Sequence, residues 1–137
     1  MAKEYLNAFM NNSATVRGTL ASAITGAPHK AVVFDSDGNI ALPTAAGDPA
    51  LGFVLSDAPG GDTGETPAGT EVDVLIKDIG LGEASAAIAK GAAVSVTATG
   101  TLATAAKGDF ILGFAMTAAS AKGELVQVQI TKSGYAS

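Results

Sequence analysis

Two stretches of the chain alternate large apolar residues with glycine or small residues, and the second repeats the first 61 residues later. Residues 50–55 read Ala-Leu-Gly-Phe-Val-Leu, and residues 111–116 read Ile-Leu-Gly-Phe-Ala-Met. A period of two places the bulky side chains on one face of a strand. We therefore predict two equivalent strands. Gly52 and Gly113 are predicted where another backbone comes close, either the other half of the molecule or a neighbouring chain.

The segments around these strands repeat as well. Residues 31–34 and 40–42 predict a hairpin, and residues 71–77 predict a strand with one polar face. Residues 94–102 repeat the hairpin at an offset of 62, and residues 126–130 repeat the Val-x-Val-x-Ile strand at an offset of 54. The smaller offset means that the first copy has a loop seven residues longer than the second.

These repeats predict an all-β fold, a small β-barrel or sandwich built from two tandem copies of a β unit. The predicted duplicated domain covers residues 29–137, with repeat one at about 29–78 and repeat two at about 88–131. The polar face of strands 71–77 and 125–131 is expected to be wet or subunit-facing. The predicted core consists of Val32, Phe34, Leu51, Phe53, Leu55, Val72, Val74, Ile76, Leu112, Phe114, Val126, Val128 and Ile130.

Residues 1–28 differ from the rest and are interpreted as an extended N-terminal arm. Tyr5, Leu6, Phe9 and Met10 would line one side of a short helix. A frayed terminus and an arm that docks on a partner are the alternatives, and the four large apolar residues favour the docking arm. A second stretch of helix formers, residues 83–90, is compatible with one or two helical turns or with an extended connection.

The extra length of the first copy lies in the loop Asp57–Thr70. This loop carries Asp57, Asp62 and Glu65 but no lysine or arginine. Insertions of this kind sit at the surface, because a buried loop would strand backbone polar groups. A solvated hairpin tip and a contact surface are both compatible with its composition.

Composition excludes several classes of function. The chain has no cysteine and one histidine, so neither disulfides nor zinc sites are expected. Its formal net charge is −5 with scattered lysines, which argues against nucleic-acid binding. No apolar run is long enough to span a membrane, and the N-terminus lacks the apolar region of a secretory signal. We expect a soluble protein made inside the cell.

The residues that invite a catalytic or metal-binding interpretation have simpler roles. Residues 35–39, Asp-Ser-Asp-Gly-Asn, are spaced like the start of a calcium loop, but their counterpart keeps only the glycine, so a hairpin turn is predicted. Asp48 and Asp109 each follow a glycine before a strand, where aspartate caps a turn. His29 has no partner that would complete a site. We therefore predict no enzyme, no catalytic residue, no metal and no cofactor.

Several of these motifs resemble phage head decoration proteins. They are the Lys-Ala or Lys-Gly step before a valine pair, Gly-Asp before Leu-Gly-Phe, and the closing Val-x-Val-x-Ile. The chain resembles small alanine- and glycine-rich capsid cement proteins, distantly similar to the lambda head protein D. The resemblance covers about residues 24–131, and its most telling stretches are residues 88–94 and 109–114.

The resemblance implies a non-enzymatic protein that binds the outer capsid surface, commonly as a homotrimer, and clamps neighbouring subunits of the major capsid protein. It also implies an arm that orders against the capsid, and the candidate contacts are Tyr5, Leu6, Phe9, Met10 and Arg17. The alternative is a carbohydrate- or cell-surface-binding module of a virion fibre, with residues 57–70 as the contact. A small β-barrel hydrolase or metal protein is a third hypothesis. No nucleic acid or membrane partner is expected.

Overall fold

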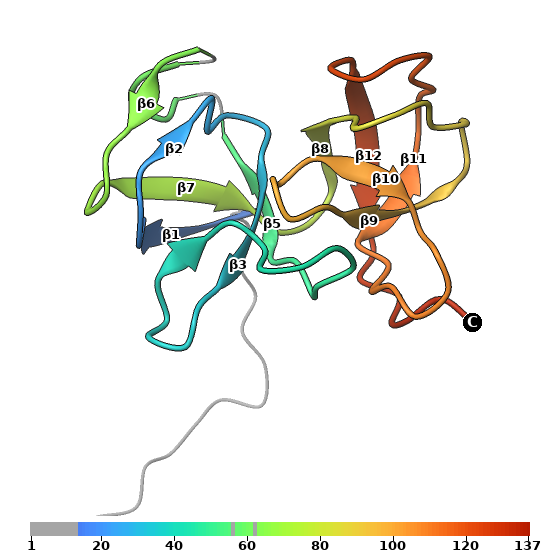
Figure 1. Ribbon diagram of the computed structural model, residues 1–137, viewed down its shortest axis with the longest axis horizontal. Coiled ribbons are helices and arrows are strands. Elements are labelled where there is room, and N and C mark those ends of the chain that lie inside the picture. Colours follow the sequence, from blue (N-terminus) through green and yellow to red (C-terminus); the bar gives the residue numbers. More distant parts are fainter. Residues whose placement is uncertain (1–13, 56, 62) are drawn as a thin grey trace, which may run out of the picture.

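The computed structural model describes residues 14–55, 57–61 and 63–137, and it is all-β over these ranges (Figure 1). The prediction of an all-β fold is confirmed, and the sheets pack in a sandwich-like way without closing into a barrel. No helix in the described ranges is long and apolar enough to cross a membrane. The strands are β1 Thr15–Thr19, β2 Ile24–Thr25, β3 Ala31–Phe34, β4 Ile40–Ala41, β5 Gly52–Val54, β6 Glu65–Thr66, β7 Glu71–Leu75, β8 Ile79–Glu83, β9 Ala93–Val96, β10 Leu102–Thr104, β11 Gly113–Ala115 and β12 Leu125–Ile130.

Two five-stranded antiparallel sheets have the same topology. The first has the order β1-β7-β5-β3-β4, and the second, read from its other edge, has the order β8-β12-β11-β9-β10. Residues 14–77 are called unit 1 and residues 78–137 unit 2. In each unit the first strand is followed by a residue that forms a parallel bridge to the opposite edge strand, Leu20 to Ile40 and Ala84 to Leu102. The duplication read from the sequence therefore extends to the fold of each half.

Each unit also begins with a strand that the period-two pattern does not predict. Strand β1 pairs with β7 over its full length, and β8 pairs with β12 in the same way. Strands β1 and β2 fall within residues 1–28, the predicted arm: β1 belongs to the first sheet, and β2 forms a separate two-stranded sheet with β6. The predicted helical contacts of residues 5–10 lie outside the described residues.

The long loop of unit 1 is largely exposed but contains a short strand, β6, in a separate two-stranded sheet. Within it, β6 pairs with β2, the Thr66 side chain is fully buried, and its hydroxyl donates to the Pro59 carbonyl. The segment 83–90 takes the extended alternative: Glu83 ends β8, and Ile88 forms an antiparallel bridge to Ala119. The alanine-rich segment 83–90 does not form a helix, because its backbone pairs with neighbouring segments instead.

Two hydrophobic cores fill the molecule, one in each unit. Val32, Ile40, Val72 and Val74 are buried in the core of unit 1, as the alternation of β7 predicts. The core of unit 2 contains Val126 and Val128 together with other buried residues. It also contains Phe53, which comes from β5 of unit 1 and is only 1% exposed. Strand β5 lies between the two units in Figure 1, so a side chain from unit 1 completes the core of unit 2.

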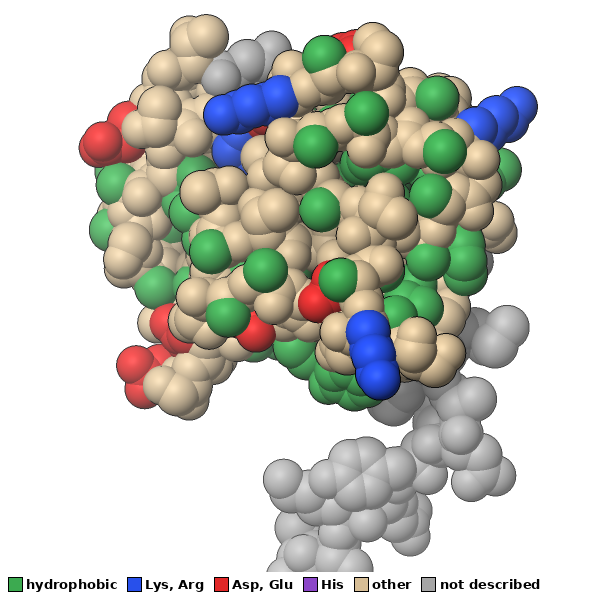
Figure 2. Space-filling model, turned by 45° about the vertical axis from the view of Figure 1, so that its right-hand side comes forward, with side chains coloured by type: hydrophobic (Ala, Val, Ile, Leu, Met, Phe, Trp, Pro, Cys, Tyr) green, Lys and Arg blue, Asp and Glu red, His purple; other side chains and the backbone are tan. Residues whose placement is uncertain are grey.

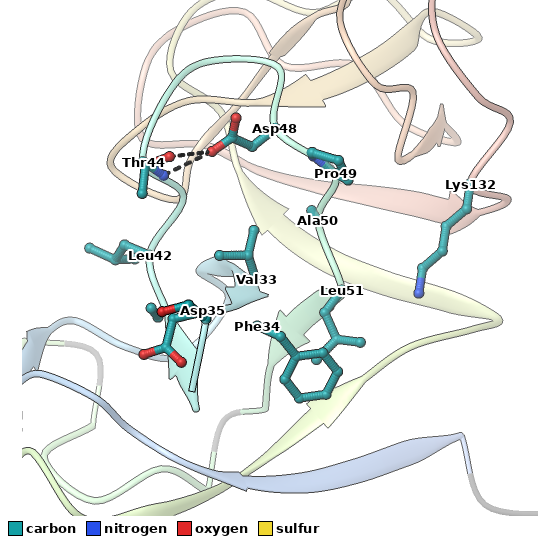
Figure 3. Close-up of a pocket in the computed structure, with 12 residues that line it drawn as sticks. Val33, Phe34, Asp35, Leu42, Thr44, Asp48, Pro49, Ala50, Leu51 and Lys132 are labelled. Atoms are coloured by element: carbon teal, nitrogen blue, oxygen red, sulfur yellow. Dashed lines mark hydrogen bonds between the residues drawn. The ribbon is translucent and has the colours of Figure 1, made fainter. Parts of the chain in front are cut away.

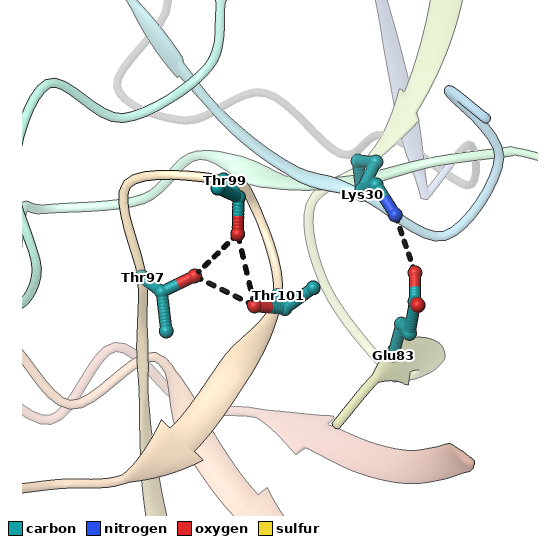
Figure 4. A network of polar contacts seen from close by, with 5 residues as sticks. All are labelled: Lys30, Glu83, Thr97, Thr99 and Thr101. Atoms are coloured by element: carbon teal, nitrogen blue, oxygen red, sulfur yellow. Dashed lines mark hydrogen bonds and ion pairs between the residues drawn. The ribbon is translucent and has the colours of Figure 1, made fainter. Parts of the chain in front are cut away.

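Polar contacts reinforce this junction. The Ala31 N–H donates to the Gly100 carbonyl at 2.8 Å, and the Gly47 N–H donates to the Val96 carbonyl at 2.9 Å. Lys30 of unit 1 forms an ion pair with Glu83 of unit 2, and both side chains are largely buried (Figure 4). The two units are thus joined by apolar packing, backbone hydrogen bonds and one shielded ion pair.

Two predicted core residues are exposed, and these predictions are wrong. Phe34 is 54% exposed and Phe114 is 36% exposed. In β11 the inner face carries Gly113 and Ala115, so the bulky side chain between them points outward. The alternating pattern identifies two faces of a strand but does not say which one is inside. Leu51, Leu55 and Ile76 from the predicted core are half-buried.

The glycines of the repeated strand lie against backbone, as predicted. A Cβ at Gly52 would overlap the carbonyl oxygen of Leu75 in β7, and one at Gly113 would overlap that of Gln129 in β12. The group that comes close is the adjacent strand of the same unit. The expectation that the other half or a neighbouring chain lies there is therefore wrong.

Candidate functional site

A groove of about 780 Å³ lies on unit 1 (Figure 3). It lies between the β3–β4 hairpin and the segment that leads into β5. Its lining is mostly apolar, with polar groups at the rim and one lysine from unit 2. We call this the unit 1 groove. It is lined by Val33, Phe34, Asp35, Ser36, Ala41, Leu42, Thr44, Asp48, Pro49, Ala50, Leu51 and Lys132.

The carboxylate of Asp48 at the groove rim is held by its own turn. The Thr44 hydroxyl and N–H donate to Asp48 Oδ2 at 2.8 and 2.9 Å, and the Ala45 N–H donates at 3.0 Å. These bonds favour the ionised form, so the hydroxyl of Thr44, aided by the two backbone N–H groups, lowers the pKa of Asp48 below its ordinary value. In unit 2, Asp109 Oδ2 accepts from the Ala106 N–H at 2.9 Å. The predicted turn-capping role of both aspartates is confirmed.

Lys132 is the basic group of the groove, and it enters from unit 2. Its backbone has a φ of 49°, in the left-handed region, and Asp78 holds the same conformation at the corresponding place after β7. Burial lowers the pKa of the Lys132 ammonium. Within the described ranges Lys132 has no acidic partner. An anionic group brought to the groove would therefore find a partly desolvated cation there.

The same place in unit 2 is covered by the end of the chain. After Lys132, residues 133–136, called the C-terminal tail, run along residues 108–111. The Ile111 N–H donates to the Gly134 carbonyl at 2.7 Å, and the Ala136 N–H donates to the Asp109 carbonyl at 2.8 Å. The Tyr135 ring packs edge-on against Phe110, with ring centroids 5.5 Å apart. The tail behaves as a short added strand with an aromatic anchor.

No described segment covers the equivalent place in unit 1 in this way. Residues 47–50 are the counterparts of 108–111, and three of them line the groove. The Ala50 N–H and the Asp48 carbonyl, which correspond to the groups that hold the tail, have no backbone hydrogen bond within the described ranges. Pro49 stands where unit 2 has Phe110. Within the described ranges, the position that the C-terminal tail fills in unit 2 is thus open in unit 1.

The outer faces of the two sheets also differ. On unit 1, Arg17 of β1 pairs with Glu71 and Asp73 of β7 at 3.3 and 3.2 Å, and the hydrogen bond that Arg17 donates to Asp73 is the main cause that raises the pKa of Arg17. On unit 2 the corresponding face is uncharged apart from Glu83 at its edge, and we call it the outer patch. It consists of Ile79, Leu81, Phe114, Met116, Leu125, Gln127 and Gln129. Figure 2 shows that charged side chains are sparse on the visible side of the molecule.

Of the predicted capsid contacts, the structure describes only Arg17, which is exposed and bound to two carboxylates. Tyr5, Leu6, Phe9 and Met10 lie outside the described residues. Neither the groove nor the outer patch is predicted from the sequence. The alternation of Ile79-Gly-Leu-Gly would have indicated β8 and its bulky face, because it repeats the period of β11.

The residues that suggest metal or acid–base chemistry have structural roles. The turn at residues 35–39 is confirmed, with Asp35 Oδ1 accepting from the N–H groups of Asp37 and Asn39. In its counterpart the hydroxyls of Thr97, Thr99 and Thr101 form a small network (Figure 4). His29 has a φ of 68° and corresponds to Gly91, which also has a positive φ. Within the described ranges no group of three or more metal-ligating side chains gathers.

Comparison with known proteins identifies the family. The family model of the XM1 gp53 minor capsid protein matches residues 9–130. Among solved structures, the N base of head fiber gp8.5 of bacteriophage phi29 is similar, with a TM-score of 0.61 and 18% identity, covering 88% of this chain and 95% of that chain. A comparison with curated proteins by sequence gave no match. The predicted resemblance to phage head proteins is confirmed at the level of a head-associated family: the chain belongs to the XM1 gp53 minor capsid protein family, and it is a structural protein of the virion.

Proposed function

We propose that this chain is a capsid decoration protein, which binds the outer surface of a phage head as a homotrimer and clamps neighbouring subunits of the major capsid protein. It acts without catalysis and without a cofactor. Membership of a minor capsid family supports a role on the head. The observation that carries the mode of binding is the open unit 1 groove, whose counterpart in unit 2 is covered by an added strand.

The unit 1 groove receives an extended segment of a shell subunit. The unpaired Ala50 N–H and Asp48 carbonyl give that segment the backbone partners that the C-terminal tail finds in unit 2. Phe34, Leu42 and Leu51 provide apolar surface for alternate side chains. Lys132 pairs with a carboxylate of the bound segment, since it lines the groove and has no acidic partner within the described ranges.

The N-terminal residues supply a second contact with the shell. Tyr5, Leu6, Phe9 and Met10 are the apolar anchors, and Arg17 exchanges an exposed intrachain ion pair for one with the shell. Exposed ion pairs contribute little to stability, so giving up the intrachain pair costs little. Clamping follows if the groove and the N-terminal residues bind different shell subunits. Once one contact has formed, the other forms at a high effective concentration.

The test is to add the purified chain to expanded, undecorated heads. We expect stoichiometric binding and a higher temperature of head rupture. Lys132→Glu should reduce binding, whereas Lys122→Glu, the same change on an exposed loop away from the groove, should not. Deleting residues 1–12 removes the proposed anchors and stops short of β1. Failure of the native chain to bind heads would contradict the proposal.

A second candidate function is a carbohydrate- or cell-surface-binding module of a virion fibre. The fold similarity to a head fiber base favours it. The contact would be the loop that contains β6. The corresponding loop of unit 2 is shorter and has no counterpart of β6. The deletion of residues 1–12 separates the candidates: head binding should fall under the decoration hypothesis, whereas a ligand site on the loop should survive.

A further inference from the structure

We propose that the outer patch of unit 2 is the surface through which copies of this chain associate. This inference rests on the homotrimer of the proposed function and assigns the interface between its subunits. It is tested on the free chain, in the absence of heads. The patch contains five of the seven large apolar side chains that the described residues expose: Ile79, Leu81, Phe114, Met116 and Leu125. Such a concentration on one sheet face is typical of an interaction surface.

The first argument is that the same surface already serves as an interface inside the chain. On unit 1, neighbouring strands bring Ala31, Phe53 and Leu75 into one row. That row packs on unit 2, where Cβ atoms at Gly80 and Gly82 would lie only 2.8 and 2.7 Å from the Phe53 ring. This surface therefore buries well against a unit of the same fold.

Unit 2 presents a corresponding row, which no described part of the chain buries in a core. Ala93, Phe114 and Gln129 are cross-strand neighbours, as their counterparts are in unit 1. Phe53 is 1% exposed and Phe114 is 36% exposed, although the two residues lie at equivalent positions. The difference arises because unit 2 packs on the row of unit 1, whereas Phe114 belongs to neither core of the described residues.

The second argument is electrostatic. On the outer face of unit 1, Arg17, Glu71 and Asp73 are charged. Their counterparts in unit 2 are Leu81, Leu125 and Gln127, so each charge is replaced by an uncharged side chain. The chain has a net charge of −5, and two copies repel unless their contact face is neutral. An uncharged face suits a second copy better than a strongly charged partner.

The third argument concerns the polar groups in the patch. Gln127 and Gln129 alternate along β12 and point to the outer face. A glutamine amide both donates and accepts, so the same residue from two copies can pair across a symmetry axis. A lysine or a carboxylate at these positions would meet its own charge. The patch is therefore chemically complementary to itself.

The experiment is sedimentation equilibrium of the free chain over a concentration series reaching about 1 mM. We expect a defined oligomer, with a trimer as the species implied by the proposed function. Leu125→Lys should weaken association by about tenfold or more, because each copy brings a new cation into the interface. Ile79→Lys, at a second exposed position, should do the same. Glu71→Lys places the same cation at the equivalent position of unit 1 and should leave association unchanged.

The outcomes separate this inference from the proposed function. A native chain that stays monomeric throughout the series overturns it, as does an oligomer that Leu125→Lys and Ile79→Lys leave intact while both remain folded by circular dichroism. A dimer that both variants dissociate supports the patch and overturns the trimer. Head binding by the native chain is measured independently, so loss of head binding with intact association would count against the decoration proposal alone.

Discussion

Units 1 and 2 share one topology but use equivalent surfaces differently. The outer face of unit 1 is charged, except where Phe53 and Leu75 pack on unit 2, whereas the outer face of unit 2 is largely apolar and exposed within the described structure. The groove beside the repeated turn shows the opposite relation, since it is open in unit 1 and covered by the C-terminal tail in unit 2. Each unit thus has one exposed surface whose counterpart in the other unit is covered.

This difference shows how a tandem duplication creates unfilled positions. When two copies of a fold pack against each other through non-equivalent faces, a surface that is buried in one copy has an exposed counterpart in the other. Phe53 and Phe114 illustrate the point, because the same residue at the same position is a core residue once and a surface residue once. When a surface is buried in one unit and its counterpart is exposed in the other, there is a physical reason to expect a partner on the exposed one.

The largest effect is expected from truncating the two phenylalanines. Phe53→Ala should lower the free energy of unfolding by about 3–5 kcal/mol, because it removes a buried ring and leaves a cavity between the units. Phe114→Ala should lower it by about 1 kcal/mol or less, because the ring is already partly in water. Urea denaturation at low protein concentration measures both without contributions from association.

Equal losses for the two variants would contradict the comparison. They would mean that Phe114 is as well packed as Phe53 within a single chain, and the outer patch would then be an extension of the core. As a control, Phe34→Ala removes the most exposed phenylalanine of unit 1 and should resemble Phe114→Ala.

The next largest effect concerns a position at which the two units are alike. Gly52→Val and Gly113→Val should each lower the free energy of unfolding by about 1–3 kcal/mol or more, because the new side chain meets a backbone carbonyl that cannot move aside. Thermal unfolding of the two variants checks this. A tolerated valine at either glycine would show that the strands of that unit separate more easily than their pairing implies.

A structural feature could be predicted from the sequence when it depends on neighbouring residues, and not when it depends on contacts between distant parts of the chain. The alternation in β7 and β12 marks both strands, and the repeated Gly-Phe pair indicates where backbones come close, because both signals are local. Strand β1 contains Arg17 and Gly18 and has no apolar alternation, so only its pairing with β7 reveals it. The local sequence around Phe53 and Phe114 is nearly the same and cannot distinguish their burial. The candidate sites follow from tertiary packing and were not predictable.

A smaller effect is expected where unit 2 is covered. Tyr135→Ala should lower the free energy of unfolding by about 0.5–1.5 kcal/mol, the contribution of an edge-on aromatic pair. It should also raise the hydrogen-exchange rate of the Ile111 amide, whose acceptor is in the tail. The corresponding Ala50 amide of unit 1 should exchange fast in the native chain and slow down when heads are bound. A protected Ala50 amide in the free chain would contradict the view that the groove is open.

The smallest effect is the pH dependence of the turn at the groove rim. The pKa of Asp48 is lowered from its ordinary value of 3.8, so the ionised carboxylate stabilises the folded state above that value. This contribution is lost as the pH falls through the lower pKa of the folded state, where the carboxyl takes up a proton. Asp48→Asn should therefore be slightly less stable than the native chain at neutral pH, and the two should converge as the pH falls below 3.8. Unfolding measured across this range checks the sign, and a gap that widens toward acid would show that the Thr44 turn does not hold the ionised form.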